Sequence, residues 1–456
     1  MSPTTAPDSL LPGHGRTPTR FLSPGLWVGD AWHRRTTSGR ITANVAIQGG
    51  GRIVLLVLGV TTSTLLGRNL GPDGYGHFAY ALAFGGALVP LVWFGLDQAV
   101  VRDIGARPTM APHLLGSTFA VKMCLAGAAT LGGLAVLPFL ATSRDQALAM
   151  AFALIVLLNT ALGTPGLIFT ATLAGGWRTL TELLTAALFL GAVALLTSGT
   201  PPIWQVVLAS GLAGTVGAAV LAALALRRTH VELSWSPSAW RVLLRRGAPF
   251  GFAGFLHQLY YRADVFLLGL LLDPHAVGLY VVAYALYDQT IPFFSYFSMS
   301  LLPVISSDPH SPSARSVIKQ GLLLAIGAAA CAALAFFLAG PSMLGLLYGA
   351  DYAEAGRVLG VLGVVLAPSF GGSVLSYALL AIGREGSIWR LTGAALVVNV
   401  AANLILIPRL GWIGSAWAML TSETVLTGLL FLTLLLGWRH HPGNREVVAC
   451  QGGLVE

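Results

Sequence analysis

Charged residues are scarce in this 456-residue sequence: Asp, Glu, Lys and Arg together make up 10% of it, whereas soluble domains carry about 25%. Hydrophobic residues make up 55%, and the mean hydropathy is +0.75. The length would allow two or three soluble domains, but so few charges could not cover their surfaces. The scarcity of charge therefore excludes a soluble protein and predicts a polytopic membrane protein.

Cysteine is also rare, and the three cysteines (Cys124, Cys331 and Cys450) lie too far apart for a metal site or a redox motif. The sequence contains neither a Gly-x4-Gly-Lys-Ser/Thr phosphate-binding loop nor a Gly-x-Ser-x-Gly nucleophile motif. The loops predicted to face outward are short and offer few charged groups. We therefore expect no enzymatic activity, no catalytic residue, no metal site and no cofactor.

Long apolar segments make up most of the chain. A helix needs about 20 apolar residues to cross a bilayer, and polar or Gly/Pro-rich connections separate twelve segments of about this length. They lie at residues 41–66, 77–96, 113–141, 147–174, 179–197, 203–226, 247–272, 277–303, 317–340, 355–381, 388–407 and 413–437. Residues 1–40 and 438–456 are polar and are predicted to form tails, the first of them disordered.

Basic residues are distributed unevenly between these segments. With both tails on one side of the membrane, that side has nineteen basic residues, the other side has four, and three lie inside predicted spans. Because Lys and Arg accumulate in cytoplasmic loops, both termini are predicted to be cytoplasmic and the chain to lie in the cell (inner) membrane. The net charge of +8 is then a signal of topology, and no nucleic-acid partner is expected.

Two connections recur six spans apart. GRNLGPDGYGHFAYALAF (67–84) and LLDPHAVGLYVVAYALY (271–287) share the pattern Pro-x3-Gly-x-aromatic, aligned at Pro72 and Pro274. TLAGGWRT (172–179) similarly resembles LLAIGREG (379–386). Six spans return the chain to the same side, so the repeats predict two homologous halves in parallel orientation. The halves are expected at residues 41–226 and 247–437, joined by a basic cytoplasmic linker at residues 227–246.

Four stretches of the chain carry a family resemblance. They are NVAIQGGGRIVLLVLGVTTSTLLGRNLGPDGYGHFAYALAF (44–84), WFGLDQAVVRDIGA (93–106), YYRADVFLLGLLLDPHAVGLYVVAYAL (260–286) and NVAANLILIPRLGWIGSAWAMLTSE (399–423). In this order they resemble the polysaccharide and lipid-linked oligosaccharide flippases of the multidrug/oligosaccharidyl-lipid/polysaccharide exporter superfamily. The resemblance covers about residues 41–437. It implies an all-α integral membrane fold in which about twelve transmembrane helices form two homologous six-helix bundles around a central cavity, with alternating access.

A polar stripe runs along the first predicted span. Asn44, Gln48 and Arg52 recur every four residues, a spacing that places them on one face of a helix. A stripe that ends in a mid-membrane arginine is typical of a wet cavity wall, so these three residues are candidates for substrate binding. A seam of hydrogen bonds between buried helices is the alternative.

Several polar residues lie near the middle of the seventh span, among them Gln258, Tyr261, Arg262 and Asp264. Arg262 and Asp264 are two residues apart, so they do not face each other on a helix. Each therefore needs another partner or a ligand. Arginine can bind phosphate with two parallel hydrogen bonds and stays charged when desolvated. Arg262 is thus a candidate phosphate ligand, with a structural ion pair as the alternative.

Three carboxylates lie inside predicted spans: Asp264, Asp288 and Glu423. Charges in spans are unfavourable and usually face a cavity or a partner. These carboxylates either balance Arg52 and Arg262 or bind a coupling ion, Na+ or H+.

Lys122 lies about 15 Å into the third span at 1.5 Å per residue and is a further candidate for substrate binding. Tyr261 and Tyr284 are the tyrosines expected to contact sugars.

The leading hypothesis is a flippase that moves a polyprenyl-(pyro)phosphate-linked oligosaccharide from the cytoplasmic to the outer leaflet for cell-surface polysaccharide biosynthesis. Such a headgroup cannot cross about 30 Å of hydrocarbon unassisted. Membrane lipid and other polysaccharide-assembly proteins are the remaining partners considered. Three alternatives stay open: a cation-coupled small-molecule (multidrug-type) exporter of the same superfamily, a flippase for a lipid-linked peptidoglycan precursor, and a non-transporting scaffold in a polysaccharide-synthesis complex.

Overall fold

The computed structural model describes residues 37–199, 201–229, 231–233 and 237–439. The tails predicted at the two ends lie almost wholly outside these residues, as do four positions of the predicted linker, residues 230 and 234–236. Throughout the described residues the regular secondary structure is helical, without strands. The predicted all-α class is therefore confirmed.

The helices are long, as crossing a bilayer requires. The α-helices are α1 (Thr37–Trp93), α2 (Leu96–Ala106), α3 (Ala111–Leu140), α4 (Arg144–Ala153), α5 (Ile155–Leu162), α6 (Leu167–Ala171), α7 (Gly176–Leu196), α8 (Ile203–Leu226), α9 (Pro237–Leu271), α10 (Pro274–Ser307), α11 (Pro312–Tyr348), α12 (Gly356–Ala381), α13 (Glu385–Leu410) and α14 (Ile413–Arg439). Short 3-10 turns are η1 (Pro108–Met110), η2 (Thr164–Gly166) and η3 (Ala350–Ala355).

Ten segments among the described residues are long and apolar enough to span a membrane. The first of them, Ile47–Ala106, contains two crossings, because α1 is kinked at Gly71 (φ 65°) and reverses direction there. Helix α9 has 35 residues and is long enough to be a further crossing, although it carries Arg262 and Asp264. The described residues thus contain twelve crossings, in agreement with the sequence. One difference is that α9 begins at Pro237, inside the predicted linker.

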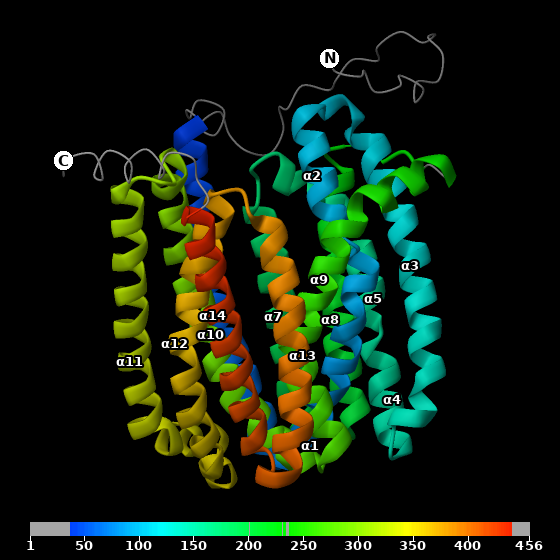
Figure 1. Cartoon of the computed structure of the whole chain (residues 1–456). Helices are drawn as coiled ribbons and strands as arrows, with labels where there is room; N and C mark the ends of the chain where they lie inside the picture. The colour runs from blue at the N-terminus through cyan, green and yellow to red at the C-terminus, as the bar shows by residue number, and fades with distance from the viewer. Residues whose placement is uncertain (1–36, 200, 230, 234–236, 440–456) are drawn as a thin grey trace, which may run out of the picture.

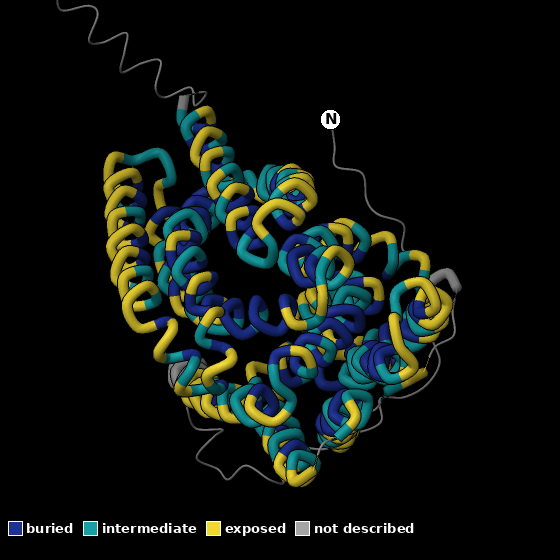
Figure 2. The backbone as a smooth tube through the Cα atoms, turned by 90° about the horizontal axis from the view of Figure 1, so that it is seen from below, coloured by how far each residue is buried: buried dark blue, intermediate teal, exposed yellow. Residues whose placement is uncertain are grey.

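The bundle has two distinct ends. Helix α1 begins and α14 ends at one of them, which we call the terminal end, and α2 lies there as well (Figure 1). The opposite end, where α1 kinks and α9 connects to α10, is the turn end. Seen along the bundle, buried backbone lies in the middle and exposed backbone around the outside (Figure 2). The exposed residues include large apolar side chains, such as Phe139, Leu195 and Leu346, as a lipid-facing surface requires.

The two repeated turns meet at the turn end. A Cβ atom on Gly76 would overlap the carbonyl of Pro274, and one on Gly278 would overlap the carbonyl of Pro72. Glycine is therefore required at both positions for the backbones to approach. Asp273 caps α10 by accepting a hydrogen bond from the amide of Ala276 at 2.8 Å. The repeated turns are thus packed closely together, and this contact joins the two halves.

The second pair of repeated connections shares a backbone geometry. The amides of Ala174 and Arg384 each donate to the carbonyl five residues earlier, at 2.7 and 2.9 Å. The preceding residues, Leu173 and Gly383, have φ values of 56° and 72°. Structurally, Leu173 is therefore equivalent to Gly383. This register differs by three residues from the alignment of TLAGGWRT with LLAIGREG, which pairs Leu173 with Leu380.

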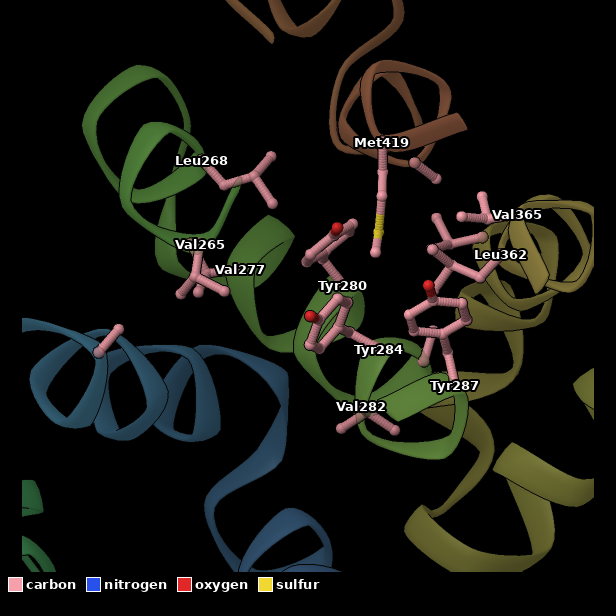
Figure 3. Packing of buried hydrophobic residues seen from close by; sticks show 14 of the residues in the cluster. Val265, Leu268, Val277, Tyr280, Val282, Tyr284, Tyr287, Leu362, Val365 and Met419 are labelled. Atoms are coloured by element: carbon pink, nitrogen blue, oxygen red, sulfur yellow. The ribbon is translucent and has the colours of Figure 1, made fainter. Parts of the chain in front are cut away.

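A row of tyrosines on α10 packs in the core (Figure 3). Tyr280, Tyr284 and Tyr287 are all buried, and the rings of Tyr280 and Tyr284 stack at 5.8 Å. Two of the three hydroxyl groups form side-chain hydrogen bonds. The hydroxyl of Tyr280 donates to Asp264, and that of Tyr287 bonds with Ser369, both at 2.8 Å. This row fixes α10 against its neighbours in the second half.

Candidate functional site

A cavity of about 1300 Å³ lies between the two halves. The first half contributes lining residues from α1, α2, α3, α5, α6, α7 and α8, and the second half from α9, α10, α12, α13 and α14. The lining includes the first turns of α7 and α13 and the last turns of α12, so the cavity lies toward the terminal end. The packed turns close the opposite end. The predicted central cavity is therefore present.

Four of the residues predicted to form a site line this cavity: Lys122, Gln258, Tyr261 and Glu423. Lys122 is buried, with 1% of its side chain exposed, and its Nζ lies 2.5 Å from Oδ1 of Asp97. Glu423 is also buried and accepts a hydrogen bond from the hydroxyl of Tyr260 at 2.9 Å. The structure thus brings both basic and acidic candidates to one cavity.

Arg52 lies at the edge of the cavity. Its guanidinium is 3.9 Å from Glu182, which lines the cavity and also pairs with Arg178 at 3.1 Å. Arg52 is nineteen residues from the kink at Gly71. At 1.5 Å per residue this is about 28 Å, nearly the thickness of the hydrocarbon core. Arg52 is therefore close to the terminal end. The sequence had suggested a position at mid-membrane.

The described part of the first stripe adds no further lining residue to the cavity. Gln48 is exposed on α1, four residues before Arg52. Asn44 belongs to α1, but its side chain lies outside the described residues. The stripe is helical, as predicted, and of its two described side chains the structure brings Arg52, and not Gln48, to the cavity edge.

Arg262 and Asp288 lie deeper, beyond the lining residues. Arg262 follows Gln258 by four residues on α9, and Asp288 precedes Ile291 by three on α10, so each lies on the helix face that lines the cavity. Both side chains are exposed. Among the described residues no carboxylate, Asp288 included, lies within 4.0 Å of the Arg262 guanidinium.

Asp264 and Tyr284 lie in the core and do not line the cavity. Asp264 is 3% exposed and accepts hydrogen bonds from Tyr280 and from Asn403 Nδ2, both at 2.8 Å. No basic side chain of the described residues lies within 4.0 Å of Asp264. Tyr284 faces the core because it stacks on Tyr280 (Figure 3). The structure brings Tyr284 to no open surface where a sugar could touch it.

A family model for polysaccharide biosynthesis proteins matches residues 41–307, more than half of the chain. The chain belongs to this family. No curated protein matches it significantly.

Solved transporters share the fold of this chain. It is similar to the inward closed conformation of the lipid II flippase MurJ, with a TM-score of 0.72 and 13% identity over 85% of this chain and 87% of that one. It is also similar to a multidrug resistance MATE family transporter of the MOP superfamily. The inward-facing form gives a TM-score of 0.67 and 18% identity over 88% and 96% of the chains. The outward-facing form gives a TM-score of 0.61 and 17% identity over 87% of this chain and 94% of that one. The predicted resemblance is thus confirmed at the level of the polysaccharide biosynthesis family, and the transporters share the fold.

A row of hydroxyl groups that was not predicted from the sequence also lines the cavity. Ser369, Ser373, Ser376 and Tyr377 line the cavity from α12. Their spacing of i, i+4, i+7 and i+8 places them on one helix face. The same spacing was visible in SFGGSVLSY (369–377) within an otherwise apolar span. We call these four residues the hydroxyl face of α12.

Proposed function

We propose that the protein is a flippase that moves a polyprenyl-(pyro)phosphate-linked oligosaccharide from the cytoplasmic to the outer leaflet for cell-surface polysaccharide biosynthesis. The cavity is the observation that carries this proposal. Its volume of about 1300 Å³ exceeds the roughly 300–1,000 Å³ of most small-molecule sites. Its lining includes hydroxyl, amide and charged side chains among apolar ones, and the outer surface of the molecule exposes large apolar side chains. A large hydroxylated headgroup needs such an environment in the membrane. The distribution of Lys and Arg supports a cytoplasmic terminal end in the cell membrane.

The glycan would bind to the second half. The hydroxyl face of α12 offers donors and acceptors, and Trp389 and Tyr261 line the same cavity. Aromatic rings combine an apolar face with a polar edge, which suits a sugar ring that has both apolar and hydroxylated surfaces. Among the described lining residues of this second half, Glu423 is the one Asp, Glu, Lys or Arg, beside the basic His257, so the wall suits an uncharged glycan.

The phosphate would bind Arg262. Three other basic residues at the cavity are already paired: Lys122 with Asp97, and both Arg52 and Arg178 with Glu182. Arg262 has no carboxylate within 4.0 Å among the described residues, which leaves its fork of donors open to two phosphate oxygens. A structural ion pair, the alternative for Arg262, would require a partner in closer contact than Asp288.

Coupling to Na+ or H+ would use Asp264. A buried carboxylate without a basic partner is unfavourable while it is charged, and a proton or a bound cation would remove the penalty. Oxygen ligands, which hard cations prefer, are close by. Asn403 accepts a hydrogen bond from Ser415 and donates to Asn399 and to Asp264. Asp264, Asn399, Asn403 and Ser415 therefore form the proposed coupling site.

One observation favours a second candidate, a cation-coupled exporter of organic cations. Among the charged residues that line the cavity, Asp97, Glu182 and Glu423 outnumber Lys122 and Arg178. A cavity with excess negative charge attracts cations.

Transport in proteoliposomes separates the two candidates. Purified protein would be reconstituted with a fluorescent polyprenyl-pyrophosphate oligosaccharide, and headgroup exposure would be followed with a membrane-impermeant quencher. The same vesicles would be tested for uptake of ethidium under a Na+ or pH gradient. We expect protein-dependent loss of the protected glycolipid pool and no ethidium uptake. Ethidium transport without glycolipid movement would overturn the flippase proposal and support the exporter.

A further inference from the structure

The ion pair between Lys122 and Asp97 is asymmetric. The Lys122 side chain is 1% exposed, whereas that of Asp97 is 25% exposed. Both line the cavity. An ammonium has three donors, and Asp97 is the one carboxylate within 4.0 Å of Lys122 in the described part of the chain. The Lys122 ammonium is held in place by burial and has donors left for a ligand, whereas the Asp97 carboxylate can turn toward solvent. A ligand that binds Lys122 would therefore displace Asp97.

Asp97 lies in the first turn of α2, directly after a tight turn. In this turn Phe94 and Gly95 have positive φ values, 44° and 68°. The turn is seated against α9: a Cβ atom on Gly95 would lie 2.6 Å from the amide nitrogen of Gly251 and 2.7 Å from the carbonyl of Gly247. The segment that carries Asp97 is thus the place where the first half touches the second half at the terminal end.

Helix α2 is held by a small core of its own. Its buried residues Leu96, Val100 and Ile104 pack with residues of α3, α6 and α9, in a cluster separate from the main core. Asp103 of α2 also pairs with Arg246 of α9 at 3.5 Å. Because α2 contacts both halves (Figure 1), whatever controls its position also affects how the halves meet.

We propose that Lys122 and Asp97 form a latch that the substrate operates. An anionic phosphate group that enters the cavity first binds the Lys122 ammonium in place of Asp97, before it reaches Arg262, which lies deeper. The released carboxylate turns to water, and α2 and the turn at residues 94–95 become free to move against α9. Binding of the charged headgroup is thereby linked to movement of the halves. This inference rests on the proposed function, because it requires an anionic substrate.

Competition for Lys122 predicts a specific effect of Asp97→Asn. Farnesyl pyrophosphate is a suitable probe, with farnesol as its uncharged control. Binding of the probe to Asp97→Asn should be at least about fivefold tighter than to the wild type, the lower end of typical coupling between two sites. Farnesol binding should not change. Asp103→Asn is the matched control, since it removes the other carboxylate of α2 but no competitor for Lys122.

Spin labels would report the movement of α2. Labels at Arg102 of α2 and Arg241 of α9, both exposed, would be introduced after the native cysteines are replaced with alanine. Farnesyl pyrophosphate should shift the distance distribution in the wild type. Asp97→Asn should show the shifted distribution without any ligand. In a Lys122→Met background, Asp97→Asn should no longer affect probe affinity. The double variant leaves no unpaired buried charge, so it tests the latch with a protein expected to fold.

The outcomes are distinct. If Asp97→Asn has wild-type affinity for the probe and a wild-type distance distribution while glycolipid flipping is normal, the pair is a structural ion pair. The latch is then overturned and the proposed function stands. If the wild type binds neither farnesyl pyrophosphate nor the glycolipid, both proposals fail. Tighter binding in Asp97→Asn that depends on Lys122 supports the latch.

Discussion

Gly76 and Gly278 pack against each other where the two halves meet. A Cβ atom on Gly76 would lie 2.9 Å from the amide nitrogen of Gly278, and one on Gly278 would lie 3.2 Å from that of Gly76. The contact is reciprocal because the two residues hold the same place in the two repeats. Beside it, His275 and Asp73 lie 3.3 Å apart, Nδ1 to Oδ2. The repeated turns thus form the seal at the turn end.

Enlarging one of these glycines should loosen the seal. In Gly76→Ala the added methyl group meets backbone, which cannot move aside as a flexible side chain could, so we expect destabilisation of about 1–3 kcal/mol. Thermal unfolding in detergent measures it. Gly59→Ala is the control, because a Cβ on Gly59 meets nothing within 4 Å. Equal melting temperatures for Gly76→Ala and Gly59→Ala would show that the turns are not in close contact.

Leu173 is a leucine in a left-handed conformation, with φ 56°. This conformation costs a residue with a Cβ about 1–2 kcal/mol, and glycine occupies the equivalent position, Gly383. Leu173→Gly should therefore raise stability by up to about 1 kcal/mol, despite the greater flexibility of glycine in the unfolded chain. Leu173→Ala keeps the strain and serves as the comparison. A Leu173→Gly protein less stable than Leu173→Ala would contradict the equivalence with Gly383.

The sequence predicted the architecture well because its signals are local. Each signal depends on one segment of the chain. The length of the apolar segments and the charges between them predicted the membrane crossings, and the turn motifs at Pro72 and Pro274 predicted the repeat. Ion pairs between residues far apart in the sequence have no such local signal. The pairing of Arg52 with Glu182, or of Lys122 with Asp97, depends on how helices pack.

The site was harder to predict for the same reason. Helical periodicity shows which residues share a face, but not what that face contacts. Tyr284 shares a helix with cavity-lining residues and yet packs in the core. The hydroxyl face of α12 was overlooked because single serines in a glycine-rich span are unremarkable until their common face is known to be open.

The hydroxyl face of α12 should matter for the glycan and not for folding. Ser373 and Ser376 are partly exposed to the cavity, so changing both to alanine leaves no buried polar group unsatisfied. We expect the flipping rate of the oligosaccharide lipid to fall about thirtyfold, from the loss of two hydrogen bonds of about 1 kcal/mol each. Flipping of a polyprenyl pyrophosphate without sugars should be unaffected. An equal loss for both substrates would contradict a role in glycan binding.

Asp264→Asn should separate transport from its energy source. The amide preserves the size of the side chain and one acceptor, but it can be neither protonated nor negatively charged. Transport by the wild type should accelerate when a Na+ or pH gradient is imposed, and transport by Asp264→Asn should not respond. Glu182→Gln, at the edge of the cavity, is the control and should keep the response. A gradient response in Asp264→Asn equal to that of the wild type would place coupling elsewhere.

The most direct test of the account is the flipping rate of Arg262→Ala in proteoliposomes that contain a fluorescent polyprenyl-pyrophosphate oligosaccharide. Arg315→Ala is the control, because Arg315 is exposed on α11, which does not line the cavity. A hydrogen bond to a charged group contributes about 1.5–3 kcal/mol. If Arg262 binds the phosphate, the flipping rate should fall at least about tenfold in Arg262→Ala and stay unchanged in Arg315→Ala. Wild-type flipping by Arg262→Ala, at normal reconstituted levels, would contradict the assignment of Arg262 as the phosphate ligand.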